Sequence, residues 1–120
     1  MDKQKFNLIL DKLLERTEKG NLEWKTTADR DTFLVILKDD SISINYSFGR
    51  EPDFDDTINN EFYTFDFRNE NGDITNSVEV VNTIATDKEF KEAARIFELA
   101  RAQAFKSDPT ADRILEQLAA

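Results

Sequence analysis

The chain has 120 residues, which suits one domain, and 39% of them are hydrophobic, including ten Phe, enough for a single core. It contains no Cys and no His, which excludes disulfides, thiolate-bound zinc and the Ser-His and Cys-His nucleophilic schemes. With 25 acidic and 16 basic residues, its formal charge of −9 disfavours direct binding to nucleic acid.

The first predicted element is an amphipathic helix over residues 3–19. Its apolar residues recur at spacings of three and four, as in one buried stripe: Phe6, Ile9, Leu10, Leu13 and Leu14. Gly20 follows the last turn, where a left-handed residue ends many helices. Trp24 comes next and is expected to close one end of the core. The apolar run at the N-terminus is too short for a signal peptide or a membrane span, so we expect a cytoplasmic protein.

A β-hairpin is predicted next. Residues 32–38 form a nearly continuous apolar run, typical of a buried strand. After a tight turn, Ile42, Ile44 and Tyr46 alternate with polar residues, the pattern of a strand with one wet face.

The middle of the chain predicts a loop followed by two more strands. Residues 48–60 are rich in Gly, Pro, Asp and Asn, which favours an exposed loop. Residues 61–68 return as a strand, and Asn71-Gly72 predicts a turn into a fourth strand over 74–81. Three aromatic residues share one face of the third strand and are expected in the core rather than on a nucleic-acid stacking platform: Tyr63, Phe65 and Phe67.

Two helices are predicted to end the chain. Thr86 and Glu89 form a capping box for a helix that runs to about Lys106. Asp108-Pro109 then supplies a cap and a first-turn proline for a short helix that carries Ile114, Leu115 and Leu118. No helix separates the strands, so the sequence predicts an α-β-β-β-β-α-α order in a two-layer α+β domain. Its antiparallel sheet of three to four strands would carry the N-terminal and C-terminal helices on one face.

The acidic residues of the predicted loop are a candidate calcium site, since carboxylate oxygens are the ligands that calcium requires. An EF-hand starting at Asp53 needs Gly at its sixth position and Glu at its twelfth, where this chain has Ile58 and Thr64. The sequence therefore predicts a solvated acidic loop, with no metal and no cofactor.

Several stretches carry a family resemblance. They are Leu13-Leu14-Glu15-Arg16-Thr17 with Gly20 and Trp24, then Thr32-Phe33, and later Phe97-Glu98-Leu99-Ala100-Arg101 leading to Ile114-Leu115. Together they resemble small uncharacterised proteins of bacteria and phages that have a helix, a few strands and C-terminal helices. The resemblance implies a cytoplasmic bacterial or phage setting, and it brings no activity and no functional residues.

The negative charge is concentrated in the segment from Glu51 to Asp73, which has eight acids and one base and so carries −7. Such a segment attracts a basic protein partner. Phe54 and Phe62, expected in the loop and on the outer sheet face, would add apolar anchors. The predicted function is a non-enzymatic protein-interaction module, an accessory, defence-related or inhibitory factor. Its predicted partner-binding residues are Glu51, Asp53, Phe54, Asp55, Asp56, Glu61 and Phe62.

Two other classes of function remain open from the sequence. The acidic strip could mimic nucleic acid and occupy a DNA- or RNA-binding protein. A pocket between sheet and helices could serve a small-molecule sensor or a carboxylate-dependent enzyme. No membrane contact is expected, and a homodimer is compatible with the one-sided sheet.

Overall fold

The computed structural model describes residues 1–50 and 59–120, with the side chains of residues 1–49 and 60–120. Helices and strands follow one another in the order α1 (Lys3–Glu18), β1 (Trp24–Thr26), β2 (Thr32–Ile36), β3 (Ser41–Arg50), β4 (Asn59–Arg68), β5 (Ile74–Val81), α2 (Asp87–Lys106) and α3 (Thr110–Ala119). The predicted α+β class is confirmed.

The sheet has five strands in the described chain, all antiparallel and in the order β1-β2-β3-β4-β5. The prediction of three to four strands was wrong because β1 was missed. β1 has only three residues, with Trp24 opposite Val35 and Thr26 opposite Phe33. A strand that short has no alternation to reveal it, and its pairing with β2 creates it.

The β3–β4 hairpin is longer than predicted. Residues 48–60 were expected as loop, but β3 continues to Arg50 and β4 begins at Asn59, with the ladder closed by the pair Arg50↔Asn59. Phe48 prolongs the alternation of Ile42, Ile44 and Tyr46, and the ladder overrides the low strand propensity of Gly49.

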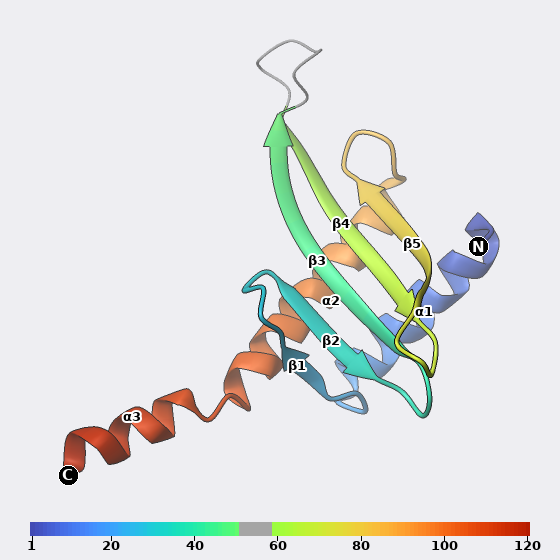
Figure 1. The fold of residues 1–120 in the computed structure, drawn as a ribbon. Coiled ribbons are helices and arrows are strands. Elements are labelled where there is room, and N and C mark those ends of the chain that lie inside the picture. The colour runs from blue at the N-terminus through green and yellow to red at the C-terminus, as the bar shows by residue number, and fades with distance from the viewer. Residues whose placement is uncertain (51–58) are drawn as a thin grey trace.

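Helices α1 and α2 cover one face of the sheet (Figure 1). Between the layers lie the buried side chains of Phe6, Leu10 and Leu13 from α1, Ile96, Phe97 and Ala100 from α2, and Phe33, Val35, Ile44 and Phe65 from the sheet. The expected place of Tyr63 and Phe65 in the core is confirmed, and Phe67 packs against the core while partly buried. Trp24 is fully buried, as predicted, and its Nε1 donates to Thr17 Oγ1 at 3.1 Å.

The predicted helix ends are largely confirmed. Gly20, just past α1, has a positive φ angle of 73°, and Gly72, in the predicted turn between β4 and β5, has one of 84°. Thr86 Oγ1 accepts from the backbone N–H of Glu89 at 3.2 Å, which caps α2. The predicted return bond of the capping box is absent from the described chain, because the carboxylate of Glu89 lies 3.3 Å from Lys3 Nζ on α1 instead.

The prediction that the last helix packs on the sheet was wrong. No residue of α3 is buried, and the helix extends away from the rest of the molecule (Figure 1). It begins at Thr110, so Pro109 precedes it, and Asp108 Oδ1 accepts from the Thr110 N–H at 2.8 Å. Because this turn directs the chain outward, the apolar stripe of α3 meets none of the sheet.

Candidate interaction surfaces

One of the predicted partner-binding residues, Glu61, lies near the distal end of the β3–β4 hairpin. It pairs with Phe48 across the ladder, and Tyr46 Oη donates a hydrogen bond to Glu61 Oε1 at 3.0 Å. Burial, and next the Glu61 carboxylate, raise the pKa of Tyr46. No Lys or Arg of the described chain forms an ion pair with Glu61. The carboxylate therefore keeps its negative charge available.

Phe48 adds an apolar group to the same end of the hairpin. Its side chain is 60% exposed, although it occupies the same sheet face as the buried Ile44. Sequence reasoning placed Phe48 in a loop and missed it as a candidate. The signal was the unbroken alternation through Tyr46.

Phe62 lies on the opposite sheet face from Glu61, because side chains alternate along β4. Its neighbours across the ladders are Ser47 and Val81, and it is half-buried. The expectation of an outer-face position is confirmed, but the structure does not bring Phe62 and Glu61 together. The other predicted partner-binding residues lie outside the described residues: Glu51, Asp53, Phe54, Asp55 and Asp56.

The remaining acids of the −7 segment lie at the other end of the sheet. Asp66 is near the end of β4, five residues and therefore about 17 Å from Glu61 at ~3.4 Å per residue, and Glu70 and Asp73 follow the strand. Asp66 accepts from Ser77 at 2.6 Å and lies 3.9 Å from Arg68. The structure thus divides the acidic segment between two ends.

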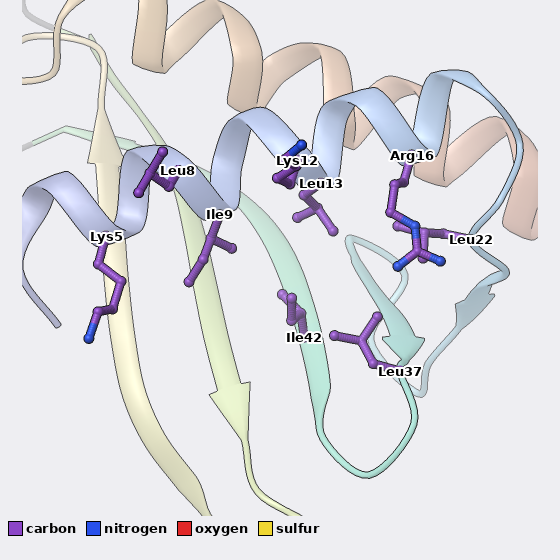
Figure 2. A pocket seen from close by; sticks show the side chains of 9 residues that line it. All are labelled: Lys5, Leu8, Ile9, Lys12, Leu13, Arg16, Leu22, Leu37 and Ile42. Carbon is purple, nitrogen blue, oxygen red and sulfur yellow. The ribbon is translucent and has the colours of Figure 1, made fainter.

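A second surface, missed from the sequence, is an apolar groove between α1 and the β2–β3 hairpin, with a volume of about 280 Å³. Figure 2 shows α1 along one side of it and Ile42 and Leu37 on the other. Three cations and no acid line the groove together with apolar side chains: Lys5, Lys12 and Arg16 with Leu8, Ile9, Leu13, Leu22, Leu37 and Ile42.

The groove is cationic, whereas the chain as a whole has a formal charge of −9. Lys12 lies 3.8 Å from Glu15, whereas Lys5 and Arg16 have no ion pair within the part of the chain that the structure describes. The sequence signal was the recurrence of cations at positions 5, 12 and 16, which share a side of one helix.

A third surface is the apolar stripe of α3. Ile114, Leu115 and Leu118 are 49%, 65% and 78% exposed. The sequence predicted a short helix that carries these residues, and the structure shows that their side chains are exposed. Exposed apolar stripes of this kind mark sites of protein association.

One group of shifted pKa values lies at the contact between α1 and α2. A carboxyl pair joins α1 to α2, where Lys88 lies 3.5 Å from Asp11 and 3.4 Å from Glu92. Burial raises the pKa of Glu92, and its hydrogen bond to Asp11 lowers the pKa of that partner. Glu92 Oε2 is buried with no hydrogen-bond partner in the described chain. These groups connect the two helices.

Comparisons with protein-family models, with curated proteins and with solved structures gave no match to this chain. Within residues 1–50 and 59–120, none of the helices is both long and apolar enough to cross a membrane. The same ranges hold no cluster of three or more acidic residues that could hold a metal ion.

Proposed function

We propose that this chain is a non-enzymatic protein-interaction module that binds a basic partner surface through the distal end of its β3–β4 hairpin, as an accessory, defence-related or inhibitory factor of bacteria or phages. The observation that carries the proposal is that the Glu61 carboxylate has no cationic partner among the described residues. Its carboxylate is bonded to a neutral phenol and pairs with no cation of the described chain. A carboxylate that no described cation of the chain neutralises is available to a partner.

The surroundings of Glu61 support this proposal. Exposed Phe48 stands opposite it and offers the kind of aromatic anchor that carries much of the binding energy in protein interfaces. The sequence places further acids directly before this strand, at Asp53, Asp55 and Asp56. Charge would then steer a basic partner toward this end, and Phe48 would hold it.

The state of the tyrosines supports a non-enzymatic role. Burial raises the pKa of Tyr63 to about 12, so its phenol keeps its proton at neutral pH and is a poor base. Tyr63 packs between Phe90 and Phe97, with ring centroids 5.5 and 5.6 Å away. Its shifted pKa therefore reflects core packing.

A nucleic-acid mimic receives less support from the geometry. Such a mimic needs a continuous row of negative charge, whereas the described acids of the segment lie at two ends of β4. A partner that contacts one end would leave the other in water.

The test uses charge reversal with a matched control. Asp53→Lys, Asp55→Lys and Asp56→Lys reverse charges in the segment that precedes β4 in the sequence. Asp39→Lys, Asp40→Lys and Glu70→Lys make the same change in the turns at the opposite end of the sheet. Proteins captured from a bacterial lysate are compared by mass spectrometry. The proposal predicts basic partners that the first variant loses and the control retains. Equal loss with both variants would mean that only net charge matters, and it would overturn the proposal.

A further inference from the structure

Two surfaces of this chain are apolar, exposed and opposite in charge. One is the groove lined by α1, with Lys5 and Arg16 near its two ends. The other is the stripe of Ile114, Leu115 and Leu118 on α3, which no other described part of the chain buries. Each surface lacks a partner within the described chain.

Two carboxylates of α3 complement the cations of the groove, whereas Arg113 of the same helix does not. Asp112 and Glu116 are one helical turn apart and fall on the same side of the apolar stripe. A helix whose stripe enters the groove would place these two carboxylates along its rim, where the cations lie. Charge pairing at the rim sets orientation and specificity, and apolar burial supplies affinity.

The lengths of the two surfaces also agree. The groove follows α1 from Lys5 to Arg16, which spans about 16 Å at ~1.5 Å per residue. Helix α3 has 10 residues and is about 15 Å long by the same rise. We propose that the groove of one molecule receives α3 of a second copy of this chain, and that the exchange is reciprocal in a two-fold dimer.

A helix suits this groove better than a small molecule. Ligand pockets enclose most of their ligand. This groove is instead open to solvent along its length, beside α1. A second copy is favoured over an unrelated helix because one chain carries both halves of the contact. Two copies that meet can therefore bury both α3 stripes in a single closed assembly.

The first test is the oligomeric state of the full chain. Sedimentation velocity over a concentration series should show a monomer–dimer equilibrium, with a dissociation constant between about 1 μM and about 1 mM for a contact of this small size. Leu115→Glu with Leu118→Glu should weaken dimerisation at least about tenfold and leave the far-UV circular dichroism of the domain nearly unchanged, because neither side chain is buried. A wild-type chain that stays monomeric throughout would overturn the proposal.

The second test is a charge exchange. Lys12 and Arg16 have the same one-turn spacing as Asp112 and Glu116. Lys12→Glu with Arg16→Glu should therefore weaken the dimer, and so should Asp112→Lys with Glu116→Lys, while the four changes together should restore it. Lys91→Glu with Lys106→Glu makes the same charge change on the exposed side of α2 and should leave the dimer intact. Failure of the combined variant to recover would overturn the pairing of rim and helix.

The other occupants of the groove give different results. If α3 folds back into the groove of its own chain, the protein stays monomeric and the Leu115→Glu, Leu118→Glu variant lowers its melting temperature. If the groove serves a lipid-like anion, a fatty acid used as probe binds the monomer and the α3 changes have no effect. Either result contradicts the dimer. Both leave the acidic hairpin proposal intact, because none of these substitutions touches Glu61 or its neighbours.

Discussion

Trp24 shows how one residue sets a boundary of the fold. The side chain was predicted to close the core, and it does so with its indole N–H bonded to Thr17 in the last turn of α1. Gln103 of α2 adds a bond from its Nε2 to the Leu22 carbonyl at 2.7 Å. The backbone N–H of Trp24 donates to Gln103 Oε1 at 3.3 Å, so Trp24 joins α1, α2 and β1. β1 itself is too short to be recognised from the sequence.

We expect Thr17→Val to lower the free energy of unfolding by about 1–3 kcal/mol, because the buried indole N–H would lose its acceptor. Chemical denaturation measures the change. Thr26→Val, at an exposed position of β1, is the control and should have little effect. Equal effects of the two substitutions would show that the Trp24–Thr17 bond contributes nothing.

The Glu92 carboxyl makes a pH-dependent prediction. Its pKa is raised in the folded state, so its contribution to stability is present below the unfolded pKa and is lost as pH rises through the folded pKa. Asp11 has a lowered pKa and acts in the opposite direction. Glu92→Gln removes the first effect. The free energy of unfolding of the variant, minus that of the wild type, should therefore be larger at about pH 7 than at about pH 4 in denaturant titrations. The reverse order would contradict the assignment of the proton to Glu92.

At the scale of helices and strands, local signals located most elements. The three-and-four spacing gave α1, the capping box gave the start of α2, and Asn71-Gly72 gave the β4–β5 turn. The sequence did not reveal strands whose existence or length depends on pairing with a neighbouring strand. β1 forms because β2 offers it an edge, and β3 extends through Gly49 because β4 lies beside it.

The candidate site was less predictable than the fold. Alternation placed Phe62 on the outer face correctly, but no local pattern says that α3 leaves the domain or that α1 and the β2–β3 hairpin enclose a groove. An apolar stripe looks the same whether it is buried or exposed. Its partner is a property of the assembled molecule.

The capping of α2 predicts a measurable stability contribution. Thr86→Ala removes the acceptor of the Glu89 N–H and should lower the free energy of unfolding by about 1 kcal/mol in chemical denaturation. Thr86→Ser keeps the hydroxyl and should stay close to wild type. If serine fails to restore stability, the hydroxyl is not the cause.

Substitutions on the apolar stripe of α3 are expected to leave the stability of the monomer unchanged. At concentrations below dimerisation, Leu115→Glu with Leu118→Glu should shift the melting temperature by no more than about 2 °C, because α3 buries no residue. Leu10→Ala is the positive control and should cost about 2–5 kcal/mol, since Leu10 is fully buried. A large shift in the α3 variant would show that the helix packs on its own domain.

At the scale of the whole molecule, two surfaces of opposite charge lie apart, and each combines charge with apolar side chains. The carboxylate of Glu61, which pairs with no cation among the described side chains, lies at one end of the sheet with exposed Phe48 opposite it. The cationic groove lies along α1, and α3 is unburied. The acidic hairpin end can meet a basic partner while α1 and α3 meet a second copy.

The salt dependence of partner affinity tests the central claim most directly. With a captured partner purified, titration calorimetry at low and high salt is carried out on the wild type, the Asp53→Lys, Asp55→Lys, Asp56→Lys variant and the Asp39→Lys, Asp40→Lys, Glu70→Lys control. We predict that wild type and control bind with similar affinities that fall steeply with salt, and that the hairpin variant binds at least about tenfold more weakly with a flatter dependence. Binding by the hairpin variant that matches the wild type at every salt concentration would contradict the account.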